Sequence, residues 1–167
     1  MPPYLTFCVG ETITNFDCTS ATEAFSDLGD LNPNVVSAAQ AQMVVATNAS
    51  NGYSAWVTGT SMTSGNNVLP GMSGGTAQKG VAQFGLNLRA NTSPSVGQDP
   101  SGPGVGAVPA GYNQANHFRF NPGDTVATSP VPDNFRKYTV SYVVDVASGQ
   151  PGGVYSTTLT YVCLANF

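Results

Sequence analysis

Short runs in which apolar and polar residues alternate, separated by Gly, Pro and Asn, predict β-strands along most of the chain. The clearest run is 136–146, in which Tyr138, Val140, Tyr142 and Val144 fall on one face. Turn residues recur about every 8–12 positions, a spacing that is typical of β-sandwiches. The other runs that we expect to form strands are 4–9, 12–16, 39–47, 53–60, 81–90, 115–120, 124–129 and 154–165.

This pattern predicts an all-β fold, an antiparallel β-sandwich of Ig-like or jelly-roll-like type with about eight or nine strands. At most one short helix is expected, near 21–28, where a faint helical spacing of apolar residues is cut short by Gly29 and Pro33. The length of 167 residues predicts a single domain, 1–167.

Two hairpins are expected from the turn residues. Asn51-Gly52, between two alternating runs, predicts a tight turn that joins 39–47 to 53–60. The turn at 150–153 predicts a C-terminal hairpin of the strands 136–146 and 154–165.

The segment 91–113 is rich in Pro and Gly and has no hydrophobic periodicity. Loops of this length without secondary structure are usually functional or mobile. We therefore expect 91–113 to be a long surface loop and a candidate binding element.

Composition indicates an exported protein. Charged residues make up 8% of the chain, against about 25% in ordinary domains, while hydrophobic residues reach 41%. The net charge is −4 with only five Lys and Arg, so no basic patch is available for nucleic acid. No apolar run approaches the roughly 20 residues of a membrane helix. The start, MPPYLTFCVG, lacks the features of a signal peptide, so we expect that a leader has been removed.

Three cysteines in an exported chain indicate one disulfide and one odd thiol. A Cys8–Cys18 bond would close a loop of about ten residues and stabilise the fold by roughly 3 kcal/mol, whereas Cys8–Cys163 would close most of the chain for roughly 5 kcal/mol. Loop entropy does not choose between them, because geometry comes first. We favour Cys8–Cys18, with Cys163 as a buried free thiol.

Residues for catalysis or metal binding do not cluster in the sequence. His117 is the only histidine, so neither a catalytic triad nor a zinc site is expected. Residues from Asp30 to Asn34 have the oxygen-ligand rhythm of a calcium loop, but Val35 stands where Gly is expected and Ala41 where Glu is expected. We therefore expect a turn at Asp30, and no catalytic residue, metal or cofactor.

Several motifs occur along the chain in the order PPYLTFCVG, QMVVATNASNGYS, QFGLNLRANTSPSVGQDPSGPG, YNQANHFRF and FRKYTVSYVVDVASGQPGGVYSTTLTYVCLANF. With these motifs the chain resembles a family of uncharacterised exported surface proteins of ultrasmall, host-attached bacteria of the candidate phyla radiation. The likeness spans nearly the whole chain, with its motifs in a fixed order. It implies a secreted or surface-displayed β-sandwich without assigned chemistry. A weaker similarity links the C-terminal strands to bacterial pilus and surface sandwiches.

Two functions are expected from these features. The first is a non-enzymatic, pilin-like structural subunit of a filament or envelope, which self-associates by exchange of its terminal strands. The alternative is an adhesin-like module that binds a glycan or a host surface protein through the loop 91–113 and exposed aromatic residues. The candidate contact residues are Trp56, Tyr53, Asp99 and Tyr112.

Overall fold

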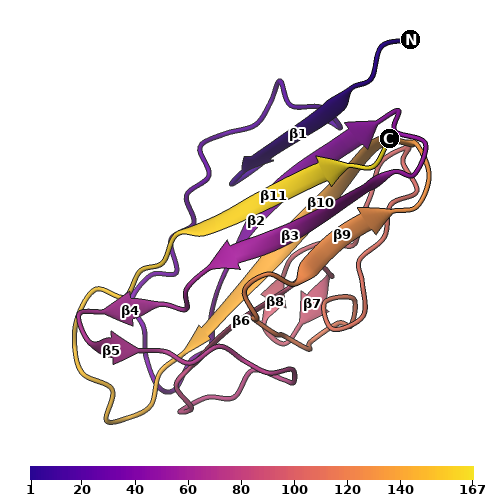
Figure 1. The fold of residues 1–167 in the computed structure, drawn as a ribbon. Coiled ribbons are helices and arrows are strands. Elements are labelled where there is room, and N and C mark those ends of the chain that lie inside the picture. Colours follow the sequence, from indigo (N-terminus) through magenta and orange to yellow (C-terminus); the bar gives the residue numbers. More distant parts are fainter.

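A computed structural model describes all residues, 1–167, and contains only β-strands and connecting segments (Figure 1). Two antiparallel sheets pack face to face. The four-stranded sheet has the order β1 (Leu5–Gly10), β2 (Ser37–Thr47), β10 (Asp133–Asp145), β6 (Gln83–Asn87). The three-stranded sheet has the order β11 (Leu159–Ala165), β3 (Tyr53–Gly59), β9 (Thr125–Ser129).

The predicted β-sandwich is confirmed, with a correction to its strands. The chain has eleven strands rather than eight or nine. The predicted runs 12–16 and 115–120 form only isolated bridges, whereas four two-residue strands that were not predicted form two small ladders. No helix forms near 21–28, where at most one short helix was expected, and that segment is an irregular, largely exposed connection. The small ladders pair β4 (Thr63–Ser64) with β5 (Asn67–Val68), and β7 (Asn91–Thr92) with β8 (Ser95–Val96).

The core lies between the two sheets and follows the predicted alternation. From β10 it receives the predicted face Tyr138, Val140, Tyr142 and Val144. β3 contributes its alternate residues Tyr53, Ala55 and Val57, all without solvent exposure. The residues between them in β3, including Trp56, point away from the core.

The two predicted hairpins are wrong. β2 and β3 belong to different sheets, so the turn at Asn51-Gly52 is an arch between the layers. β10 and β11 are likewise separated, because β11 pairs with β3 alone. Alternation of apolar and polar residues shows which face of a strand turns inward. The pattern is the same for two strands that pair within one sheet and for two strands that face each other across the core, so it does not distinguish these arrangements.

Connecting segments cover the outer face of the four-stranded sheet, so that β10 is buried on both faces. Residues 11–23 cross this face. There, the Ile13 N–H donates to Gln42 Oε1 at 2.7 Å. Lys137 Nζ donates to the Ile13 carbonyl at 2.8 Å and lies 5.0 Å from the centre of the Phe16 ring. Covering this sheet therefore depends on polar contacts as well as on apolar packing.

Candidate functional site

One side of the sandwich, at β6 and β9, is sealed by segments that pair with the strand edges. Ser101 exchanges two backbone hydrogen bonds with Lys137 of β10, and Ala107 exchanges two with Thr128 of β9. Residues 101–107 therefore run from one sheet to the other. The outer edge of β6 is covered in the same way by Arg119, which exchanges two bonds with Leu86. No long strand on this side is left with a free edge over its whole length.

A buried polar cluster fixes this crossing segment to the core. The Asp133 carboxylate accepts hydrogen bonds from the N–H groups of Val105 (2.6 Å) and Gly106 (3.0 Å) and from Tyr53 Oη (3.2 Å). Tyr53 Oη lies 2.7 Å from Tyr138 Oη. Burial, reinforced by the neighbouring Tyr138 and Asp133, raises the pKa of Tyr53 far above its usual range. Both tyrosines therefore stay neutral and act as hydrogen-bonding core residues.

The opposite side of the sandwich, which we call the open side, ends in β1 and β11 (Figure 1). Each of these strands pairs with one neighbour only: β1 with β2, and β11 with β3. The two strands make few contacts with each other and do not pair. The open side therefore presents two unpaired strand edges, one from each sheet.

The bonds around β11 show which of its backbone groups face the open side. Thr128 directs both of its backbone bonds to Ala107, so its neighbours in β9 must bond to β3. Successive residues of an antiparallel strand direct their N–H and C=O groups to opposite sides. In the registers of β9 with β3 and of β3 with β11, this alternation directs the backbone N–H and C=O groups of Val162 toward β3. The N–H and C=O groups of Tyr161 and Cys163 therefore face the open side.

The same reasoning applies to β1. Lys137 directs both of its bonds to Ser101, away from β2. The registers of β10, β2 and β1 then make Cys8 bond to β2. The N–H and C=O groups of Phe7 and Val9 face the open side, and neither residue forms a backbone hydrogen bond with another segment there.

The side chains of these edge residues are apolar and only partly buried. Phe7, Val9, Tyr161 and Cys163 all pack against the core from its margin. Burial raises the pKa of the Cys163 thiol to about 11, so this cysteine is protonated at neutral pH and is a weak nucleophile. Unpaired backbone and incompletely buried apolar side chains thus coincide on the open side.

A groove continues the open side toward the end of the sandwich away from the chain termini. Its volume is about 1030 Å³, and its walls are the segments 24–33 and 146–161. Val9, Leu159 and Tyr161 line it from the two edge strands. We call this feature the open-side groove.

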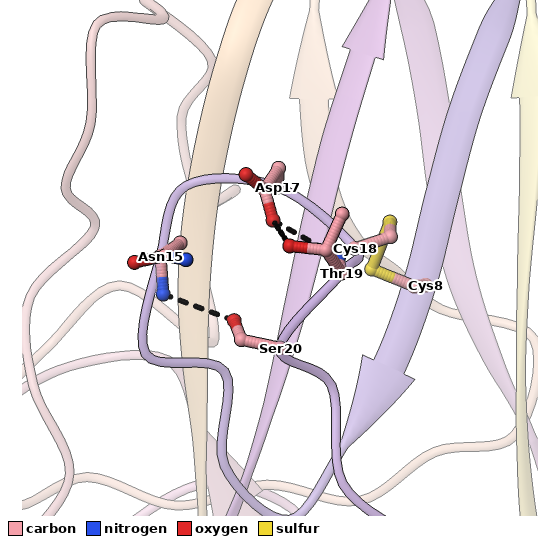
Figure 2. The surroundings of a disulfide bond; sticks show 6 residues. All are labelled: Cys8, Asn15, Asp17, Cys18, Thr19 and Ser20. Atoms are coloured by element: carbon pink, nitrogen blue, oxygen red, sulfur yellow. Dashed lines mark hydrogen bonds between the residues drawn. A yellow bond between two sulfur atoms is a disulfide. The ribbon is translucent and has the colours of Figure 1, made fainter.

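The disulfide joins Cys8 and Cys18, the favoured pairing, and Cys163 is free and partly buried. Figure 2 shows that the bond links β1 to the irregular segment that follows it. That segment is held by local bonds: Asp17 Oδ1 accepts from the N–H and hydroxyl of Thr19, at 2.9 and 2.6 Å. The disulfide therefore ties β1 to its own domain.

The four candidate contact residues have different environments. Tyr53 and Tyr112 are buried, and Tyr112 Oη donates to Asp124 at 2.8 Å, so neither tyrosine is presented at the surface. Asp99 is exposed and pairs with Arg89 at 2.7 Å. Trp56 is partly buried and lies on the outer face of the three-stranded sheet, opposite the core-facing residues of β3. The structure does not bring these four residues together.

The structure holds no cluster of metal-binding side chains. No group of three or more His, Cys, Asp or Glu side chains lies close enough to hold a metal ion. His117 lies at the rim of a separate polar pocket of about 510 Å³ formed mainly by the glycine-rich segment 70–76. Asp30 is exposed at the open-side groove.

The chain matches no protein-family model, and comparison with curated proteins and with solved structures found no significant match. The structure contains no helix with the length and apolar character needed to span a membrane.

Proposed function

We propose that this protein is a non-enzymatic structural subunit of an exported cell-surface assembly, and that copies associate through the edge strands β1 and β11. The observation that carries the proposal is the asymmetry of the sandwich. Its β6 and β9 side is sealed by paired segments, while β1 and β11 leave their outer edges unpaired. Exposed strand edges are the usual route by which one β-protein adds strands to another.

The disulfide supports an exported location, because disulfides form and persist in oxidising compartments. It also bears on how copies associate. Because Cys18 ties β1 to its own domain, pairing of intact edges between copies requires less rearrangement than release of β1 to a neighbour. The alternative, recognition through 91–113, has less support, since residues 101–107 are engaged with the core and with both sheets.

The proposal is tested with a variant that blocks the edges without removing an internal ladder bond. By the alternation along each strand, the N–H groups of Leu5 and Ala165 face the open side, and both residues lie near strand ends. Leu5→Pro with Ala165→Pro therefore removes two outward donors. Ser148→Pro is the matched control, a proline substitution away from the two strand edges. The bond from Gln150 N–H to the Ala147 carbonyl closes a turn in which Ser148 is the second residue, a position that favours proline.

Sedimentation velocity and negative-stain electron microscopy over a range of concentrations provide the measurement. The wild type and Ser148→Pro are expected to form oligomers or filaments, and the double edge variant is expected to remain a 17.2 kDa monomer. A wild type that stays monomeric at the highest attainable concentration would refute the proposal. So would a double edge variant that folds and assembles like the wild type.

A further inference from the structure

The open-side groove has apolar residues on both of its walls, among polar ones. Leu28 and Leu31 on one wall and Tyr155 and Leu159 on the other pack against the core from its margin and leave part of their surfaces in the groove. Val154, also on this wall, is 85% exposed. Burial of such apolar surface by a ligand is favourable at about 25 cal/mol per Å².

The backbone along both walls is largely unpaired. Residues 24–31 form no backbone–backbone hydrogen bond. Of residues 151–158, Ser156 alone is paired, through two bonds with Thr63. Unpaired N–H and C=O groups beside an apolar groove suit an extended peptide, which supplies matching backbone groups and alternating side chains.

The charge around the groove is negative and is not balanced within the chain. Asp27 and Asp30 are exposed on the groove wall, and no Lys, Arg or His lines it. The two ion pairs of the structure, Arg89–Asp99 and Arg119–Asp124, involve neither aspartate. Residues 1–78 contain no Lys or Arg at all.

This charge also indicates that the ligand of the groove differs from the chain itself. Neither terminal segment, 1–10 or 154–167, contains a Lys or Arg. A terminal strand from a second copy would therefore offer Asp27 and Asp30 no cationic side chain as a counter-charge. A segment with basic residues beside its apolar side chains would complement the groove in both respects.

We propose that the open-side groove binds an extended segment of another protein, with alternating apolar side chains flanked by Lys or Arg. Resting on the proposed function, this inference assigns a second contact to the assembly subunit. Copies of the chain pair through the strand edges near the termini, and the groove at the other end anchors a basic partner segment.

Fluorescence anisotropy with designed peptides tests the inference. The probe is labelled Lys-Val-Thr-Val-Thr-Val-Lys, and its controls are the same peptide with Glu at both ends and a version N-methylated at alternate residues. The wild type is expected to bind the lysine peptide at least tenfold more tightly than either control. Equal binding of the lysine and glutamate peptides would overturn the charge assignment, and undiminished binding of the N-methylated peptide would overturn strand-like docking.

Protein variants locate the binding. The double variant Asp27→Asn, Asp30→Asn is expected to bind the lysine peptide about fivefold more weakly than the wild type at low salt, because two exposed charge pairs are lost. This difference in affinity should shrink at high salt. Glu11→Gln with Glu23→Gln removes two charges outside the groove and is expected to have a smaller effect. Val154→Lys adds a cation to the groove wall beside the two aspartates and should reduce the preference for the lysine peptide over the glutamate peptide. Unchanged binding in the Asp27/Asp30 and Val154 variants would refute the inference.

The outcome is separable from that for self-association. Assembly is measured without peptide, and peptide binding is measured on the monomeric edge variant, in which Asp27, Asp30 and Val154 are unaltered. Loss of peptide binding with assembly retained would overturn the groove inference alone.

Discussion

The buried Tyr53 hydroxyl is the point at which the sealed side of the sandwich is fixed to its core. It lies within hydrogen-bonding distance of both Tyr138 Oη and the Asp133 carboxylate. Tyr53→Phe removes this hydroxyl and leaves the ring in place. Asp133 keeps its bonds from Val105 and Gly106, whereas Tyr138 Oη loses the partner given for it in the structure.

The magnitude follows from these contacts. A buried polar group left without a partner costs about 1–3 kcal/mol, and a hydrogen bond to a charged acceptor contributes about 1.5–3 kcal/mol. Because Asp133 remains bonded twice, we expect the lower end of the sum, about 2–3 kcal/mol. For a domain of this size each kcal/mol lowers Tm by about 2–4 °C, so Tm should fall by about 5–10 °C.

Thermal unfolding followed by circular dichroism measures this effect, with Tyr4→Phe as the matched control. Tyr4 is 40% exposed and its hydroxyl has no hydrogen-bond partner, so the same chemical change there should leave Tm nearly unaltered. Hydrogen exchange should also become faster at the Val105 and Gly106 amides. Equal Tm values for the two variants, with unchanged exchange at 105 and 106, would refute the role given to this cluster.

Three further predictions concern other parts of the fold. Cys8→Ser with Cys18→Ser opens a loop with a sequence separation of 10 and should lower the free energy of unfolding by about 2.7 kcal/mol in a urea titration; an unchanged midpoint would contradict this. Burial raises the pKa of the Asp145 carboxyl group above its ordinary value of 3.8, so folding favours its protonated form. The stability that this group contributes is fully present below pH 3.8 and is lost as the pH rises through its pKa in the folded protein. Asp145→Asn should therefore raise Tm at pH 7 but not below pH 3.8, and a lower Tm at pH 7 would argue against this. The Cys163 thiol, with a pKa of about 11, should react with iodoacetamide at pH 8 about a hundredfold more slowly than a thiol of ordinary pKa 9.0, and a rate like that of the unfolded chain would be inconsistent with its burial.

Much of the fold was predictable because alternation reports directly on burial. The face of β10 that carries Tyr138 and Tyr142 was predicted in this way, and the structure places it in the core. The pairing of strands was not predictable from the same pattern. An arch such as 48–52 and a hairpin turn both join two strands that point apolar side chains in one direction.

The sealed side was missed because residues 101–107 show no periodicity. Their contacts are made by backbone N–H groups to Asp133, Phe135 and Thr128, which no side-chain pattern records. A signal was present in the alternate glycines. A Cβ atom at Gly104 or Gly106 would overlap the carboxylate of Asp133 or its neighbours, so these positions require Gly.

The open side was equally hidden in the sequence. Phe7 and Tyr161 lie in runs whose apolar and polar residues alternate as they do in interior strands. The alternation therefore does not show that these strands lie at the edge of a sheet. An edge becomes visible only when the register of every neighbour is known.

The central claim, that copies associate through β1 and β11, is tested most directly by hydrogen–deuterium exchange at single-residue resolution in the monomeric and assembled protein. We predict that the amides of Phe7, Val9, Tyr161 and Cys163 exchange rapidly in the monomer and become protected on assembly. The amides of Ser101 and Ala107, already bonded to β10 and β9, should be protected in both states. New protection that appears elsewhere, with the four edge amides unchanged, would contradict the claim.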